Sequence, residues 1–323
     1  MWQWRRFCAP IALFMMDWAS IAGGSAALAT AFLWACSGTA WGFAGRRIGA
    51  LAVNILRISL ASAILWGCYA IAHGAWLPQL SGRAWVLLGI SGAIGVGIGD
   101  ICYFRCVVIM GPRLASVVLA LSPIFASAIS YFPPLREHLG AQALVGICLT
   151  VAGVTWVVAE PGAGRAWQMP KDASFVQGLA LGIAGSMASA LGMVLTRMAF
   201  VTGAGELATD SSAAAVVRVW AGLVVTAVAV IASRRVVMVG RSLSDGRSML
   251  IVLAGTLVGP VLGIWLSMVA LKLIPAGIGV ALIYTSPIMM VPLAWAFYHE
   301  RPTGRAIAGT VLAVLGAALL MLR

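Results

Sequence analysis

The chain has 323 residues, of which 62% are hydrophobic and only 9% are Asp, Glu, Lys or Arg. Soluble globular proteins carry about 25% charged residues, so this composition excludes an ordinary soluble domain. About 200 apolar residues, at roughly 20 per crossing, give room for about ten transmembrane helices. We therefore expect an all-α integral membrane protein.

The net charge of +12 points to lipid rather than to nucleic acid. In a soluble chain this balance would suggest a nucleic-acid partner. Here the basic residues are dispersed between apolar runs, in short pairs such as Arg46-Arg47 and Arg234-Arg235. Those positions suit anionic lipid headgroups. We expect the lipid bilayer as a partner, no nucleic acid, and a multi-pass location in the cell membrane.

No pattern in the sequence carries the chemistry of an enzyme or a metal site. The six cysteines form no C-x-x-C pair, and the H-E-x-x-H, G-x-S-x-G and P-loop motifs do not occur. No expected span holds two acidic residues. We expect no catalysis, no metal and no cofactor. A membrane-embedded enzyme and a non-transporting scaffold or receptor are the alternatives to a transporter.

The expected elements begin with residues 1–21, a lead-in at the membrane interface. Its apolar segment runs through Asp17 into the first span without a small-residue cleavage site, so it does not read as a cleavable signal. A start at Met15 or Met16 is the alternative. Continuous apolar runs then predict ten helices: 22–43, 50–73, 84–105, 113–132, 137–159, 175–199, 212–232, 249–271, 277–298 and 303–322.

The two halves of the chain repeat each other. A polar, Gly- and Pro-containing linker at 160–174 separates residues 22–159 from residues 175–323, with five expected helices in each. The motif Ser-Pro-Ile recurs at an offset of 164, and so does a pair of glycines four residues apart. The matched residues are Ser122-Pro123-Ile124 with Ser286-Pro287-Ile288, Gly95 and Gly99 with Gly259 and Gly263, and, in similar contexts, Arg57 with Arg218.

An odd number of crossings per repeat has a topological consequence. The second repeat must enter the membrane from the opposite side, so the two repeats are inverted about an axis in the membrane plane. Two such halves can exchange conformations and open a central site to either side in turn. The repeat therefore favours a transporter over a static anchor.

Two segments make the chain similar to a known family. They are GIGDICYFRCVVIMGPRLASVVLALSPIFASAISYF (97–132) and SPIMMVPLAWAFYHERPTGRAIAGTVLAVLGAALL (286–320). With the two arginines, they resemble the EamA-type members of the drug/metabolite transporter superfamily. The resemblance implies ten helices in two EamA repeats, a central cavity lined mainly by helices 1, 3, 4, 6, 8 and 9, and a small-molecule substrate. The turns at Glu137 and Glu300 depart from the family's Gly-Glu-Arg-like pattern.

Asp100 is the only acidic residue placed inside an expected span, because the other eight lie in expected loops, termini or helix ends. An intramembrane carboxylate is costly and marks a functional site by default. Asp100 could carry protons in exchange for substrate, or it could form a structural ion pair with Arg57 or Arg105. Arg218 has no such partner within its own half. It could bind a substrate carboxylate or phosphate, or backbone carbonyls at a helix end.

The remaining candidate residues are prolines and polar or aromatic side chains within spans. Pro123 and Pro287 are expected mid-helix, where each removes one backbone hydrogen bond and marks a hinge or kink. Lipid-interface or core packing is the alternative for each aromatic residue. The full set of expected pathway residues is Asp100, Tyr103, Arg57, Arg218, Trp34, Trp41, Asn54, Trp265 and Tyr284.

Together these features predict a secondary transporter working by alternating access. We expect proton-coupled or gradient-driven export of a small metabolite, amino acid or drug-like molecule, by a monomer or homodimer. The resemblance implies that both termini lie inside the cell. The basic residues that flank the spans are more numerous on the side opposite the termini, which implies the reverse. The orientation stays open between the two.

Overall fold

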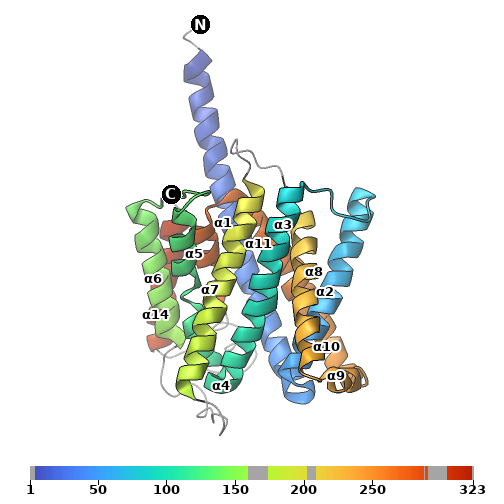
Figure 1. Cartoon of the computed structure of the whole chain (residues 1–323). Coiled ribbons are helices and arrows are strands. Elements are labelled where there is room, and N and C mark those ends of the chain that lie inside the picture. The colour runs from blue at the N-terminus through green and yellow to red at the C-terminus, as the bar shows by residue number, and fades with distance from the viewer. Residues whose placement is uncertain (1–3, 159–173, 202–208, 287, 290–303, 322–323) are drawn as a thin grey trace.

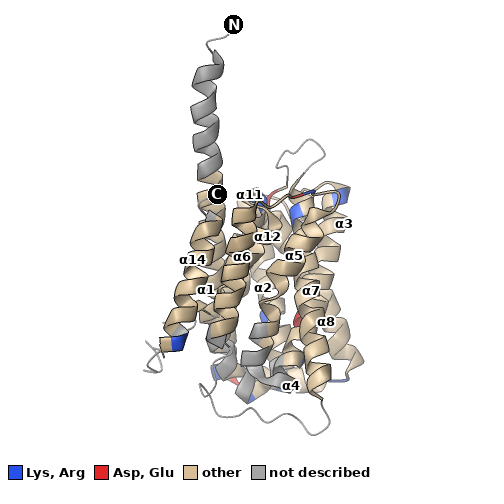
Figure 2. Ribbon diagram, turned by 90° about the vertical axis from the view of Figure 1, so that its left-hand side faces the viewer, with Lys and Arg blue, Asp and Glu red and all other residues tan. Residues whose placement is uncertain are grey.

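The structure is a computed structural model that describes residues 4–158, 174–201, 209–286, 288–289 and 304–321. These residues form a bundle of helices packed side by side (Figure 1). Figure 2 shows that Lys, Arg, Asp and Glu lie mainly at the two ends of the bundle, while most of each helix is uncharged. This distribution fits a protein whose long apolar sides face lipid.

The second helix matches its expected apolar run, and the first is longer than expected. Helix α1 (Trp4–Ile48) begins earlier than expected, so the lead-in is not a separate segment but is continuous with the first span. This stretch is rich in Ala, which favours uninterrupted helix. Helix α2 (Ala50–His73) follows directly after Gly49, whose φ of 88° suits glycine, and ends at Gly74, whose φ is 62°.

The expected break between the helices at 84–105 and 113–132 is wrong. Helix α3 (Gly82–Ser91), the π-helix η1 (Gly92–Ile98) and helix α4 (Gly99–Leu119) follow one another without a break. A proline inside a membrane helix removes one backbone hydrogen bond, but neighbouring groups can satisfy the freed carbonyl, so the helix need not end there.

The break lies instead at Ala120 and Leu121, before α5 (Ser122–Tyr131). Pro123 therefore lies in the first turn of α5 and does not kink the middle of a helix, which corrects the expectation. The first turn is the place where the missing N–H of proline costs least. Pro287 lies outside the described residues.

The remaining helices follow the sequence pattern from the fifth expected span onward. They are α6 (Ala141–Val158), α7 (Phe175–Phe200), α8 (Ser211–Ala232), α9 (Val236–Ser242), α10 (Gly246–Thr256), the π-helix η2 (Leu257–Gly263), α11 (Ile264–Leu273), α12 (Ala276–Ile283) and α14 (Gly304–Met321). The short helix α9 was not expected. Four helices begin at a Ser or Asp whose side chain accepts a backbone N–H two or three residues into the helix, a common N-cap: Ser81, Ser174, Asp210 and Asp245.

Irregularities of the helices recur in both halves. The π-helix η1 contains Gly95, and η2 contains Gly259, its counterpart in the sequence repeat. Turns interrupt the chain at 120–121 in the first half and at 284–285 in the second half, which is the same offset of 164. The two halves therefore share their departures from ideal helix as well as their motifs.

Corresponding helices of the two halves run in opposite directions. In Figure 1, α1 runs downward and α7 upward, and α2 runs upward and α8 downward. Among the described residues, six helical stretches are long and apolar enough to cross a membrane: Trp18–Gly38, Leu51–His73, Gly82–Cys106, Phe175–Phe200, Ser211–Ala232 and Gly246–Leu273. Shorter apolar helices cover Ala141–Trp156 and Ile307–Leu320.

The last helix of each half packs against the other. A Cβ added at Gly153 of α6 would lie 2.6 Å from the Gly309 carbonyl oxygen of α14. One added at Gly316 would lie 2.8 Å from the Gly146 carbonyl oxygen. These four glycines thus bring the two helix backbones into direct contact, as small residues do in membrane proteins.

Candidate functional site

A buried ion pair joins α2 and α4. The Arg57 guanidinium pairs with Asp100 through Nη2, and its Nε donates to Asn54 Oδ1 at 2.9 Å. The guanidinium also lies 5.3 Å from the centre of the Phe104 ring, within cation–π range. Of the two arginines considered for Asp100, the structure places Arg57 against it. The side chain of Asp100 keeps 26% of its surface exposed.

Arg218 occupies the matching position of the second half. Arg57 is the eighth residue of α2 and Arg218 is the eighth residue of α8. Arg218 is only 3% exposed, and its Nη1 lies 3.5 Å from Met193 Sδ and 3.7 Å from Met268 Sδ. Among the described residues, the Nε of Arg218 is the one buried side-chain nitrogen or oxygen atom that has no hydrogen-bond partner.

Glycines of η1 create the space in which Arg218 lies. A Cβ added at Gly92 would lie 2.1 Å from the Arg218 carbonyl oxygen, so α8 packs directly on the η1 backbone. One added at Gly95 would lie 3.3 Å from Arg218 Nη2. The Gly-rich sequence of η1 therefore lets a large cation fit beside a helix in the interior.

Tyr284 lies at the break after α12 and contributes an aromatic ring and a hydroxyl. It is 7% exposed, and its hydroxyl lies near the side chains of Ser189 and Ser122. Its ring meets that of Trp34 from α1 edge to face, with 6.3 Å between centroids. Trp34 in turn lies against Gly263, where an added Cβ would come within 2.6 Å of Trp34 Nε1. Helices from both halves therefore supply this aromatic pair.

The three charged groups and Tyr284 form one electrostatic cluster. Arg57 and Arg218 are the buried charged side chains among the described residues, and Asp100 interacts electrostatically with both. Tyr284 also lies within electrostatic range of Arg218. The formal charges of Arg57, Asp100 and Arg218 leave one positive charge. Such a charge inside a membrane bundle is costly unless an anion compensates it.

The other expected residues lie in different surroundings. Tyr103 packs beside Cys106, Leu179 and Leu181 at the interface of α4 with α7. Trp265 is 40% exposed. The side chain of Trp41 lies outside the described residues. The structure thus brings Asn54, Arg57, Asp100, Arg218, Trp34 and Tyr284 into one region.

Several residues of this region were not expected from the sequence. Met193, Met268 and Ser189 contact Arg218 or Tyr284, but methionines and serines within apolar helices are common packing residues. Of the two serines near the Tyr284 hydroxyl, Ser122 could have been suspected from the sequence, because it belongs to the repeated Ser-Pro-Ile motif. Nothing in the local sequence marks the two methionines.

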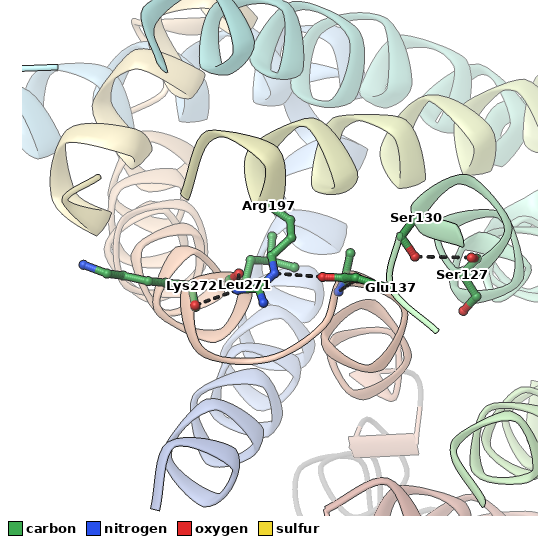
Figure 3. A network of polar contacts seen from close by, with 7 residues as sticks. Ser127, Ser130, Glu137, Arg197, Leu271 and Lys272 are labelled. Atoms are coloured by element: carbon green, nitrogen blue, oxygen red, sulfur yellow. Dashed lines mark hydrogen bonds and ion pairs between the residues drawn. The ribbon is translucent and has the colours of Figure 1, made fainter. Parts of the chain in front are cut away.

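A second polar network closes one end of the bundle (Figure 3). Arg197 Nε donates to Glu137 Oε1 at 2.9 Å, and Arg197 Nη1 donates to the carbonyl oxygens of Leu271 at 3.0 Å and Lys272 at 2.7 Å. Glu137 Oε2 accepts the backbone N–H of Ala276 at 2.9 Å. The network ties the end of α7 to the turn after α5 and to the junction of α11 with α12.

Within the described ranges, no group of three or more His, Cys, Asp or Glu side chains could hold a metal ion. The polar groups of the central region are suited to binding and proton exchange, because they combine a partly exposed carboxylate with two cations.

Comparison with known proteins gives a family match and matches to solved structures. The sequence model of a family described as the EamA-like transporter family matches residues 21–159 and again residues 176–322. A solved structure, described only as a crystal structure of a protein, superimposes with a TM-score of 0.67 at 20% sequence identity. The alignment covers 93% of this chain and 95% of that one. No curated protein matches.

Proposed function

Because the chain belongs to the EamA-like transporter family, we propose that it is a secondary active transporter that exports a small metabolite, amino acid or drug-like molecule. It acts in the cell membrane, as a monomer or a homodimer. The observation that carries the proposal is the central region, where two matched arginines, one carboxylate and an aromatic pair from both halves meet inside an apolar bundle.

The proposed architecture is ten transmembrane helices in two inverted repeats of five. It is supported by the opposite directions of α1 and α7 and by the matched π-helices η1 and η2. The glycine contacts between α6 and α14 also pair the halves reciprocally, Gly153 with Gly309 and Gly146 with Gly316. Such a bundle can alternate between two states related by exchange of its halves, which exposes the central region to either side.

The proposed coupling ion is the proton, with Asp100 as its carrier. In the present state Asp100 is paired with Arg57. Protonation of Asp100 removes its negative charge, releases Arg57 from the pair and frees α2 from α4 at this point. The two protonation states therefore favour different packings of these helices, as coupled transport requires.

A flux assay in proteoliposomes tests the proposal. Purified wild type is reconstituted, and a compound panel is screened for movement driven by an imposed pH gradient. We expect flux in wild type and loss of the pH-driven component in Asp100→Asn. Asp245→Asn, which changes an acidic residue at the start of α10, is the matched control and should keep full coupling.

Two outcomes contradict the proposal. Folded wild type that moves no compound of the panel favours a scaffold or receptor. Undiminished proton-driven flux in Asp100→Asn removes Asp100 from the coupling step while leaving transport itself in place.

A further inference from the structure

Arg57 and Arg218 occupy matching positions but have unlike partners. Arg57 has a carboxylate, a side-chain amide and an aromatic ring around it. Arg218 has two thioether sulfurs near Nη1, and its Nε has no hydrogen-bond partner although the residue is 3% exposed. A thioether is a weak acceptor, so it does not replace an oxygen.

This arrangement is costly and needs a compensating group. A buried cation without an acceptor loses its hydration without regaining the hydrogen bonds. The packing nevertheless holds Arg218 in place, since Gly92 and Gly95 of η1 leave room for its backbone and guanidinium. The residue is thus kept in the interior with part of its hydrogen-bonding capacity unused.

The chemistry of the missing partner follows from the charges. Arg57, Asp100 and Arg218 sum to one positive charge, so a single negative charge makes the region neutral. A guanidinium presents its N–H groups in a plane that matches the two oxygens of a carboxylate. A phosphate would bring about two negative charges close to Asp100, which overcompensates the region.

The neighbouring side chains describe the rest of the ligand. Met193 and Met268 are adaptable apolar groups beside the guanidinium. Tyr284 lies within electrostatic range of Arg218, and its ring meets that of Trp34. These residues suit an apolar or aromatic body attached to the carboxylate. We infer that Arg218 binds the carboxylate of a monoanionic substrate whose apolar body packs against the two methionines, Tyr284 and Trp34.

This inference rests on the proposed function for the statement that the ligand is transported, but binding can be measured without flux. The probes are benzoate and phenylacetate, with benzamide and phenylacetamide as uncharged counterparts of the same shape. Binding to purified protein in detergent micelles is followed by the shift in thermal unfolding temperature over a concentration series.

We expect the two carboxylates, and neither amide, to stabilise wild type. In Arg218→Gln the apparent affinity for the carboxylates should fall roughly 10- to 100-fold, the value of a charge-assisted hydrogen bond. Arg218→Lys keeps the charge without the planar pair of donors. Its apparent affinity for the carboxylates should lie between those of wild type and Arg218→Gln. Arg83→Gln, at an exposed arginine near the start of α3, is the control and should bind like wild type.

Each remaining outcome overturns the inference. Equal shifts with carboxylates and amides, or no carboxylate shift in wild type, mean that Arg218 is satisfied by water or by the protein alone. An unchanged carboxylate shift in Arg218→Lys and Arg218→Gln places any anion elsewhere. The wild-type comparison of acid with amide needs no variant, so it decides even if Arg218→Gln does not fold.

Failure of this inference and failure of the proposed function are distinguishable. Carboxylates that bind to Arg218 but do not cross proteoliposome membranes leave the binding site standing and contradict transport. Flux of neutral compounds with no carboxylate-specific binding supports transport and contradicts the carboxylate site at Arg218.

Discussion

Arg197 and Glu137 hold four segments of the bundle at one end through a single contact. The Nε of Arg197 lies 2.9 Å from Glu137 Oε1, and each partner makes further bonds to backbone groups, Arg197 at the end of α11 and Glu137 at the start of α12. Both side chains are largely buried, with 14% and 11% of their surface exposed. The pair therefore supplies the hydrogen bonds that the ends of these helices need.

Loss of one partner of this pair should destabilise the bundle. In Glu137→Gln the carboxylate is replaced by an amide, which leaves the Arg197 cation uncompensated in a largely buried position. Breaking such a pair costs about 3 kcal/mol. Thermal unfolding of the purified variant in detergent measures the loss. The double variant Glu137→Gln/Arg197→Gln should recover part of the lost stability. A double variant that loses more stability than the two single variants together contradicts the pairing.

A side chain at Gly153 should separate α6 from α14. An added Cβ would lie 2.5 Å from the Ala313 backbone nitrogen, which cannot move without shifting α14. We expect Gly153→Val to lose about 1–3 kcal/mol of stability through overpacking. Gly67→Ala in α2 is the matched control, because a Cβ there meets nothing within 4 Å. It should be neutral or slightly stabilising, measured in the same unfolding assay.

The stability contributed by Asp245 should depend on pH in the acidic range. Hydrogen bonds from Ser248 and Arg47 lower the pKa of Asp245 from its ordinary 3.8 to about 2. Since the pKa is lower in the folded state, the contribution is complete above about pH 3.8 and is lost as the pH falls through about 2. Asp245→Asn keeps an N-cap acceptor for α10 but removes the charge.

The unfolding temperatures of wild type and Asp245→Asn should therefore differ at neutral pH and converge as the pH is lowered toward 2. Arg47→Gln removes the other member of the ion pair and should show the same convergence. A difference between wild type and Asp245→Asn that stays constant down to pH 2 contradicts the assignment.

Arg57 and Asp100 should be coupled in stability. Arg57→Gln leaves the carboxylate without its cation, and we expect a loss of about 2–4 kcal/mol because the pair lies in the interior. Arg57→Lys keeps the charge but not the bond from Nε to Asn54, so its loss should be smaller. In an Asp100→Asn background, Arg57→Gln should cost clearly less, and equal costs in both backgrounds rule out the coupling.

The sequence anticipates features that depend on composition and on spacing along the chain. An acid within an apolar run must find a partner, and Arg57 was one of two arginines considered for Asp100. The choice between Arg57 and Arg105 was open, because it depends on which face of α4 meets α2. The repeat at an offset of 164 anticipated that η1 and η2 would correspond, but not that either would be a π-helix.

Features that depend on packing between helices could not be predicted from the sequence. Pro123 was expected to kink a helix, whereas the helix ends at Leu119 and Pro123 lies in the first turn of the next one. Proline makes a helix break easier without deciding where it falls, and helix Gly99–Leu119 continues through Pro112. The two methionines beside Arg218 come from α7 and α11, and no local pattern places them there.

By itself, the sequence determined that the chain is a helical membrane protein of two similar halves, because the apolar runs and the spacing of the repeat are set by the order of residues along the chain. Only the tertiary structure decided which arginine is paired and which is left with an unpartnered nitrogen. That difference arises because Asp100 has no acidic counterpart in the second half: the same offset places Ile264 there. The folded bundle gives that one carboxylate to Arg57, and it holds Arg218 between thioethers and glycines.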